Sequence, residues 1–263
     1  MAMTRHEKFN SDFTLDLIET PLLVDNDSNC SIGLIADIQH ADVNDELTFD
    51  KLRTRYYRNS LVLTREAVEH LKRNGKPDYM IQLGDIIDAR SMKANSAPSA
   101  MQSVLNELNK INETSDAKHA QLVHIWGNHD LSCFSRDELT MSELNSAKLF
   151  NKSVAQSANY FAIDLTSSIR LIGLDFFEFA LIGYKPGDEV YEKASEYVAK
   201  SQSHPDARIS GPVRLEKMNG QPSGKQLKWL EDQLNECERE NKRAILLGHV
   251  QLIDDKNKYM AWN

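Results

Sequence analysis

Several apolar segments of this chain end in residue types that bind metal ions or transfer protons. In "IWGNHD", residues 125–130, an apolar run stops at Gly127 and is followed directly by Asn128, His129 and Asp130. The residues that end five apolar runs of strand length are Asp37, Asp85, Asn128, Asp175 and His249. One such residue is usually a turn or helix-cap residue. Several of them, most following a glycine, predict a common site if their strands share one sheet.

Carboxylates, an amide oxygen and imidazoles together suit Mn²⁺, Mg²⁺, Fe or Zn²⁺. A carboxylate shared by two ions holds them about 3.5–4 Å apart. Such a pair binds a phosphate, generates hydroxide near neutral pH and stabilises the charge on the leaving oxygen. A glycine before a ligand allows a sharp turn and leaves room for ions and substrate. The residue types therefore favour metal-dependent phosphate chemistry.

The elements that must position these residues alternate along the chain. Strands are predicted in "IGLIA" (32–36), "DYMIQLGDIID" (78–88), "HAQLVHIWGNHD" (119–130), "IRLIGLD" (169–175) and "RAILLGHV" (243–250). Helical spacing predicts helices at 50–73, 99–113 and 223–242. The alternation predicts a mainly parallel α/β core with helices covering both faces. Ligands bind outside the carboxyl ends of such strands, so the strand-end residues should lie close together.

Two segments in the second half carry more specific expectations. The helix at 223–242 is predicted to begin at Ser223 as N-cap and to place Leu227, Leu230 and Leu234 on its apolar face. The polar segment 184–222 contains prolines and is predicted to be a long, irregular surface insertion.

Length and composition limit the function classes. With 263 residues and 41% hydrophobic content, the chain can form one large domain or two small ones. A net charge of −8 argues against a nucleic-acid partner, which needs a basic face, but allows a small anionic substrate held by a metal. No apolar run approaches the ~18–20 residues of a membrane span. Cys30, Cys133 and Cys237 form no CxxC pair, which favours reduced thiols and a cytoplasmic location.

The order of the short motifs resembles a known superfamily. "DIQ" (37–39), "GDIID" (84–88), "GNHD" (127–130) and "GH" (248–249) resemble the calcineurin-type metallophosphoesterases, whose usual signature is DxH, GDxxD, GNHD/E, H and GHxH. Glutamine in place of the DxH histidine, with "RTRYYRNSL", "FSRDELT" and "AWN", is similar to the branch of manganese-dependent ADP-ribose/CDP-alcohol diphosphatases. The resemblance implies an α/β fold, a β-sandwich flanked by helices. We expect a loose leader at 1–30 and a metallophosphoesterase domain at 31–263.

The resemblance implies two divalent metal ions held by Asp37, Gln39, Asp85, Asn128 and His249. Asp37 and Gln39 would bind the first ion, and residues two apart on a strand face the same side. Asp85 would bridge both ions, and Asn128 and His249 would bind the second. A neutral glutamine oxygen is a harder donor than imidazole, which makes Mn²⁺ the first choice, with Mg²⁺, Zn²⁺ or Fe as alternatives.

The implied catalytic residues are Asn128, His129 and Asp130. Asn128 would also touch the phosphate. His129 would act beside the leaving oxygen as an acid or electrostatic stabiliser, polarised by Asp130.

The candidate substrate-binding residues are Arg58, Phe49 and Tyr57. One guanidinium among Arg53, Arg55 and Arg58 would bind a diphosphate, unless all three form a solvated helix face. Phe49, Tyr56 and Tyr57 would stack on a base or pack in the core. Three further polar residues stay outside the implied ligand set, and we expect packing for His40, a supporting or turn role for Asp88 and no defined role for Asp175.

The implied reaction is attack of a metal-bound hydroxide on one phosphorus of a nucleoside diphosphate derivative. ADP-ribose would give AMP and ribose 5-phosphate, and CDP-choline or CDP-glycerol would give CMP and a phosphoalcohol. The family pattern continues to GHxH, which this sequence does not contain, so we expect the last strands and one ligand for each metal to be missing. The alternatives are therefore a catalytically impaired, nucleotide-binding form and a broad phosphodiesterase or phosphatase.

Overall fold

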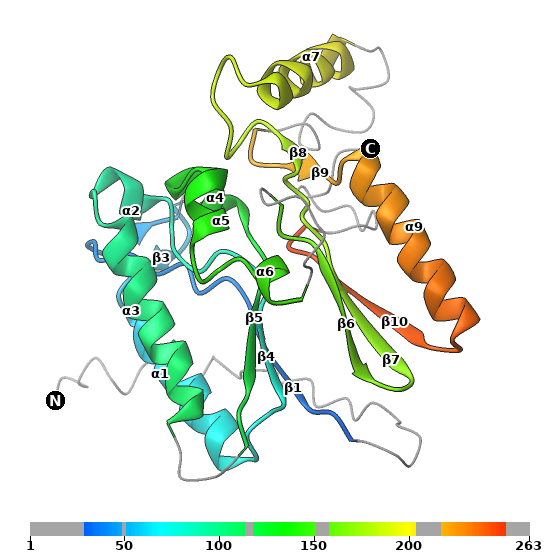
Figure 1. Ribbon diagram of the computed structural model, residues 1–263. Coiled ribbons are helices and arrows are strands. Elements are labelled where there is room, and N and C mark those ends of the chain that lie inside the picture. Colours follow the sequence, from blue (N-terminus) through cyan, green and yellow to red (C-terminus); the bar gives the residue numbers. More distant parts are fainter. Residues whose placement is uncertain (1–28, 49–50, 114–117, 151–157, 204–216, 251–263) are drawn as a thin grey trace, which may run out of the picture.

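The computed structural model describes residues 29–48, 51–113, 118–150, 158–203 and 217–250, and it has a mixed α/β fold with several small sheets (Figure 1). The strands are β1 (Ile32–Ile35), β2 (Glu46–Leu47), β3 (Thr54–Arg55), β4 (Tyr79–Gln82), β5 (Gln121–His124), β6 (Phe161–Thr166), β7 (Ile169–Gly173), β8 (Phe179–Ala180), β9 (Gly220–Gln221) and β10 (Arg243–Leu247). The helices are α1 (Asn59–Arg73), α2 (Arg90–Lys93), α3 (Ala97–Asn109), the 3₁₀ helix η1 (Lys110–Asn112), α4 (Asn128–Cys133), α5 (Arg136–Met141), α6 (Ala147–Phe150), α7 (Glu189–Ser203) and α9 (Gly224–Arg239). Among these, no helix combines the length and apolar character that crossing a bilayer requires.

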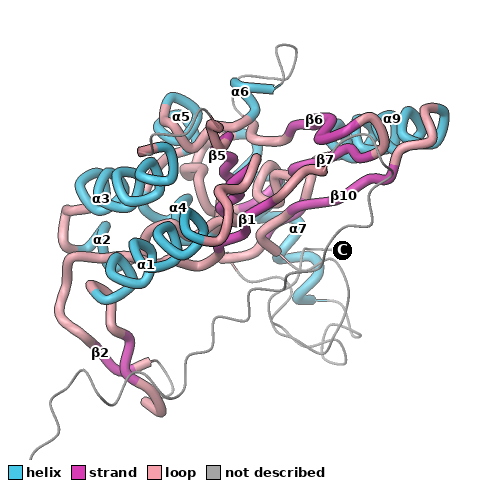
Figure 2. Tube along the Cα trace, turned by 90° about the horizontal axis from the view of Figure 1, so that it is seen from below, coloured by secondary structure: helices cyan, strands magenta, loops and turns pink. Residues whose placement is uncertain are grey.

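The first sheet has the strand order β1-β4-β5 with both pairs parallel. Parallel neighbours need long crossovers, and α1 and α3 provide them. Val68 of α1 and Leu105 and Leu108 of α3 are buried in the same core cluster as Met80 of β4. Figures 1 and 2 show α1 and α3 on the side of this sheet away from the second sheet.

The strands that carry the strand-end residues belong to two sheets. The second sheet has the order β10-β7-β6, in which β10 is parallel and β6 antiparallel to β7. A cluster of buried side chains joins the facing sides of the two sheets: Ile81, Val123, Ile125, Ala147, Phe161, Leu171 and Leu247. The prediction missed β6, which turns back directly onto β7, and therefore missed the antiparallel pairing. Helix α9 lies outside the second sheet (Figure 1).

Backbone pairing continues beyond the ends of β1 and β4. The amide of Asp37 donates to Gly84 O at 3.2 Å, and the amide of Gln39 donates to Asp85 O at 2.9 Å. Farther along, Asp88 N donates to His40 O at 2.9 Å. The motifs "DIQ" and "GDIID" therefore lie side by side.

Two predicted segments differ from the structure. The helix expected at 50–73 begins only at Asn59, because residues 54–55 form β3 and pair antiparallel with β2. The segment 184–222 is not irregular throughout, since α7 occupies Glu189–Ser203. Ala194 and Val198 of this helix are buried against Phe179 of β8. Residues 204–216 of the segment lie outside the described residues.

Helix α9 confirms the prediction of a helix capped by Ser223, whose hydroxyl accepts from Gln226 N at 3.2 Å. The predicted apolar face is only partly confirmed, because Leu230 packs against the core whereas Leu227 is 52% and Leu234 is 39% exposed. The fully buried residue of the first turn is Gln226. Its Oε1 accepts from Asp175 N at 2.9 Å, and its Nε2 donates to Asp175 O at 3.0 Å and to Glu178 Oε2 at 2.8 Å. A buried amide thus anchors this helix to the end of β7.

We expect Gln226→Leu to lower the free energy of unfolding by about 2–4 kcal/mol, because it leaves the amide and carbonyl of Asp175 buried without their partner. Leu227→Gln, one residue along the same helix, should change it by less than about 0.5 kcal/mol. Urea denaturation measures both variants. Equal effects would mean that the apolar residues anchor α9 after all.

Burial of His124 gives the fold a dependence on pH. Desolvation lowers the pKa of His124 to about 4, whereas an unfolded histidine titrates near ~6.5. The folded pKa is the lower one, so this stabilisation is complete above pH ~6.5 and is lost as the pH falls toward 4. Between pH 7 and pH 5 the loss should be about 2 kcal/mol. Denaturation of the metal-free protein should show it, and His124→Gln should remove it, whereas His119→Gln at an exposed position should not.

Candidate metal centre and active site

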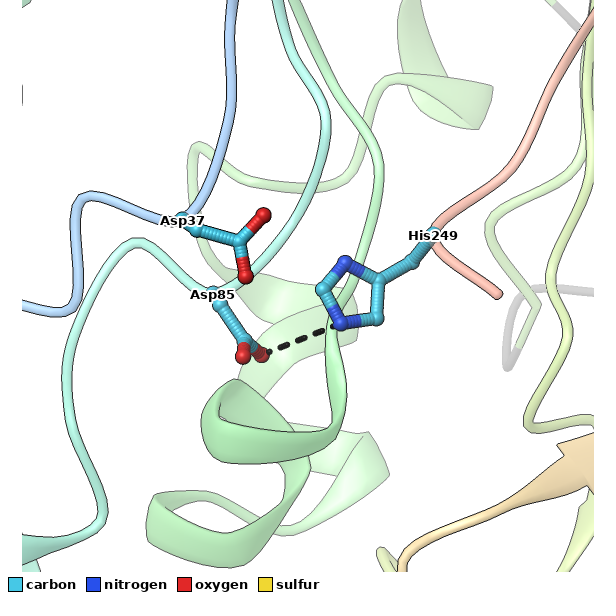
Figure 3. Close-up of side chains that lie close together, drawn as sticks. All are labelled: Asp37, Asp85 and His249. Carbon is cyan, nitrogen blue, oxygen red and sulfur yellow. Dashed lines mark ion pairs between the residues drawn. The ribbon is translucent and has the colours of Figure 1, made fainter. Parts of the chain in front are cut away.

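Asp37, Asp85 and His249 converge at the carboxyl ends of β1, β4 and β10 (Figure 3). One ligand atom from each lies within 4.8 Å of the other two. Two ligand atoms that each bind one ion at about 2.1 Å lie at most about 4.2 Å apart. The three ligand atoms therefore need to move only slightly closer together to bind a single ion. Two carboxylates and an imidazole fit a divalent metal ion, which would also offset the repulsion between the carboxylates.

Backbone contacts orient the ring of His249 toward this cluster. Its Nδ1 lies 2.8 Å from Leu83 O, a carbonyl that can only accept, so Nδ1 carries a proton. In the neutral ring Nε2 then presents a lone pair, 3.0 Å from Asn128 Oδ1 and 3.5 Å from Asp85 Oδ1. These three atoms are all acceptors, and a cation bound between them would offset their mutual repulsion. A carbonyl bound to the second ring nitrogen is the usual support of a metal-binding histidine.

The backbone at three candidate ligands lies in the left-handed region. The φ angles are 52° at Asp37, 45° at Gln39 and 56° at Asp85. Side chains other than glycine rarely adopt this region, and such residues cluster at functional sites. Asp37 and Gln39 thus do not face the same side as neighbours on a strand, because β1 ends at Ile35. The turn after the strand brings them together, with Gln39 Nε2 3.3 Å from Asp37 Oδ1.

Gln39 reaches the cluster through its amide nitrogen. Nε2 donates to Asp85 Oδ2 at 2.9 Å, and Oε1 accepts from Arg55 Nη2. For Gln39 to bind an ion through oxygen, its amide would have to turn over. Arg55 also bonds Asp88 Oδ2 at 3.2 Å, so this arginine connects the cluster to the loop after β4.

His129 lies beside the cluster, and its two ring nitrogens have the opposite donor and acceptor roles to those of His249. Ala89 N donates to His129 Nδ1 at 3.0 Å, so Nδ1 accepts and the neutral ring carries its proton on Nε2. That nitrogen points toward Asp85, 3.9 Å from Oδ2. The ring can therefore donate a hydrogen bond next to the candidate metal site.

Asp130 does not polarise His129, which corrects the expectation from the sequence. Its carboxylate accepts from three backbone amides, those of Asp85 at 2.9 Å, Ile86 at 2.9 Å and Gly127 at 2.8 Å. Burial raises the pKa of Asp130, and the charge of Asp85 raises it further. The group that lies beside His129 Nδ1 is Asp88, with Oδ2 at 3.4 Å.

Asp175 and His40 lie outside the cluster. Asp175 is buried and accepts from Arg136 and from the amides of Asn159 and Phe177, which is a structural arrangement. His40 is buried, as expected, with Nδ1 3.2 Å from Tyr57 O.

Glycines permit the close approach of the strand ends. At Gly84, where φ is +97°, a Cβ would meet the His249 ring. At Gly127 a Cβ would overlap the carboxylate and backbone nitrogen of Asp85. The space expected for ions and substrate beside these glycines is thus occupied by neighbouring protein.

A cavity of about 330 Å³ adjoins the cluster and reaches His129 and Asp88. Of the candidate substrate-binding residues, Tyr57 lines it. Arg58 is instead paired with Asp42 at 2.5 Å and Asn44 at 3.3 Å, and it does not line the cavity. Phe49 lies outside the described residues.

Comparison with known proteins agrees with this geometry. Residues 30–262 match the model of the calcineurin-like phosphoesterases. The chain belongs to this family. Manganese-dependent ADP-ribose/CDP-alcohol diphosphatases are similar to this phosphoesterase, with 30% identity to that of Mus musculus and 29% to that of Homo sapiens, each over 89% of this chain and 70% of the relative. A crystal structure of a dimetal phosphatase from Danio rerio matches with a TM-score of 0.78 at 28% identity, over 89% of this chain and 74% of that one.

Sequence reasoning missed the residues that connect this phosphoesterase site to its cavity. Arg55 was one of three equivalent arginines, and nothing in "RTRYYR" distinguishes the one that bonds Gln39. Arg90 and Lys93 were not singled out at all, since they lie in a short helix after "GDIID". The available signal was the position of Asp88, five residues before Lys93, which lines the same cavity.

We expect Gly127→Ala to weaken Mn²⁺ binding at least about tenfold, because the new methyl group must displace Asp85. Gly224→Ala is the matched control, since a Cβ there meets nothing within 4 Å. Calorimetric titration of the metal-free variants, with thermal melting to verify folding, measures the effect. Equal Mn²⁺ affinity in the two variants would exclude Asp85 from the ion's ligands.

Proposed function

We propose that this phosphoesterase hydrolyses the diphosphate bond of nucleoside diphosphate derivatives such as ADP-ribose and CDP-alcohols, with two divalent ions, Mn²⁺ foremost. The observation that carries the proposal is the convergence of Asp37, Asp85 and His249 beside a His129 ring whose Nε2 bears a proton. The names and 30% identity of the relatives support the substrate class. The inner cluster shared by the two larger sheets supports the finer expectation of a helix-flanked sandwich.

The proposed ligand set is Asp37, Gln39, Asp85, Asn128 and His249. Bound divalent ions would polarise the phosphoryl oxygens and make water nucleophilic near neutral pH. Asn128 Oδ1 and His249 Nε2, 3.0 Å apart, would hold one side of the site. Gln39 would join them once its amide oxygen turns away from Arg55.

Hydrolysis adds one water across the phosphoanhydride bond. The water oxygen joins the attacked phosphorus, and the bond from that phosphorus to the bridging oxygen breaks. The bridging oxygen keeps the electron pair and departs as part of a phosphate monoester, whose second pKa of about 6 lets it leave as an anion. His129 Nε2 holds a proton facing Asp85, with Ala89 N fixing the ring from the other side. His129 is thus suited to donate a hydrogen bond that stabilises the negative charge on the leaving oxygen.

With Mn²⁺, the protein should release AMP from ADP-ribose and CMP from CDP-choline, and EDTA should abolish both reactions. His129→Ala should lower kcat for these substrates by about 10²–10³-fold, the range for loss of one hydrogen-bond donor to a developing oxyanion. The loss should be smaller with bis(p-nitrophenyl) phosphate, because p-nitrophenolate spreads its negative charge over the nitro-substituted ring and depends less on a donor at the leaving oxygen. Steady-state kinetics with both substrate types measure the difference.

His119→Ala, at an exposed histidine, is the control for loss of an imidazole. Folded wild-type protein without Mn²⁺-dependent turnover of any substrate would contradict the proposal and favour a nucleotide-binding form. Hydrolysis of bis(p-nitrophenyl) phosphate without hydrolysis of the diphosphates would favour a broad phosphodiesterase.

A further inference from the structure

The cavity beside the candidate metal centre is lined by cations although the chain carries a net charge of −8. Arg55, Arg90 and Lys93 line it, and Asp88 is the single carboxylate among the lining residues. Tyr57, Leu47 and Met92 supply apolar surface. A local excess of positive charge in an acidic protein attracts an anion into a defined place.

His129 forms a wall that the cavity shares with the candidate metal centre. Its Nδ1 edge faces Ala89 and Asp88, which line the cavity, and its Nε2 edge faces Asp85. The ring thus borders the cavity with one edge and the candidate metal centre with the other. Arg55 connects the two more directly, because it lines the cavity and bonds the candidate ligand Gln39, which itself bonds Asp85 Oδ2.

Arg55 is held with donors to spare. A guanidinium has five N–H donors, and its described bonds to Gln39 Oε1 and Asp88 Oδ2 use two. The group lies 5.9 Å over the ring of Tyr57, which is buried, and its side chain is 39% exposed. Such an orientation suits binding of a phosphate through paired N–H groups.

The other two cations differ in how far they are neutralised. Arg90 pairs with Glu46 at 2.8 Å and forms a side-chain hydrogen bond with Tyr57. Lys93 is exposed and, among the described residues, makes no hydrogen bond or ion pair. Its ammonium is therefore available to a ligand without breaking an existing contact.

We infer that this cavity binds the second, non-scissile phosphate of a diphosphate-linked substrate, with Arg55 and Lys93 as the residues that determine this specificity. The inference rests on the proposed function, which places the scissile phosphate at the carboxylates. Two phosphates of a diphosphate share one oxygen, so the second must lie in an adjacent site. The cavity meets this requirement, because its lining residue Arg55 bonds the candidate ligand Gln39.

The test compares the binding of α,β-methylene-ADP, whose P–C–P link resists hydrolysis, with that of AMP, which has one phosphate. Calorimetry in Mn²⁺ on the full chain gives both dissociation constants. The wild type should bind α,β-methylene-ADP at least about tenfold more tightly than AMP, and Lys93→Met and Arg55→Met should each reduce this ratio to about threefold or less. Lys228→Met, at an exposed lysine of α9, is the control and should keep the ratio.

Lys93→Met is the more specific test of the cavity, because Arg55 also bonds Gln39 and its substitution changes the surroundings of that candidate ligand. An unchanged ratio in both variants would overturn the inference. It would be overturned as well if Arg55→Met weakened both ligands equally and Lys93→Met weakened neither, because Arg55 would then act through Gln39.

The binding ratio also separates this inference from the proposed function. A wild type that shows the Lys93-dependent ratio without hydrolysing ADP-ribose supports the cavity and refutes the hydrolysis. Hydrolysis with a ratio that neither variant changes refutes the cavity alone.

Discussion

The buried carboxylate of Asp130 is the interaction on which the arrangement of the site depends. It joins the loop after β4 to the start of α4 by accepting from the amides of Asp85, Ile86 and Gly127. Burial of a carboxylate is unfavourable, and the nearby charge of Asp85 adds to the cost. Three amide donors offset it, and they leave Asp85 with its side chain directed at His249 rather than at the core. Negative charge is thus concentrated in a small volume, and a bound divalent cation would offset the repulsion between the carboxylates.

The sequence predicted the ends of the strands better than it predicted the sheet. Each expected strand is present, because runs such as "MIQ" and "LVH" are apolar and are followed by glycine or a polar motif. The mainly parallel core was only partly right, because β6 pairs antiparallel with β7 in a second sheet. Parallel βαβ units do not reveal where one sheet stops and the next begins. Only the pairing of β6 with β7 shows that boundary. Helix α9 shows a similar limit. Helical spacing predicted a buried face made of leucines, whereas tertiary hydrogen bonds bury Gln226 in its first turn.

At the site, residue types were predictable but side-chain partners were not. The order of the motifs identified Asp37, Asp85 and His249 as candidate metal ligands, and the structure brings their side chains together. The resemblance assigned Asp130 to His129, yet adjacent residues of a helix point in different directions. The true neighbours come from a loop some forty residues earlier, at Asp88 and Ala89. Long-range contacts of this kind leave no local pattern in one sequence.

The two histidines beside Asp85 show how backbone partners assign chemistry to identical side chains. Nδ1 of His249 faces a carbonyl and must donate, which leaves Nε2 as an acceptor suited to a metal ion. Nδ1 of His129 faces an amide and must accept, which leaves Nε2 as a hydrogen-bond donor. Exchanging Leu83 O and Ala89 N would exchange the roles of the two rings. Because both partners are backbone atoms, substitution of Leu83 or Ala89 would preserve the assignment. It is therefore a property of the loops that follow β4, which also carry Asp85 and lead directly to the cationic cavity.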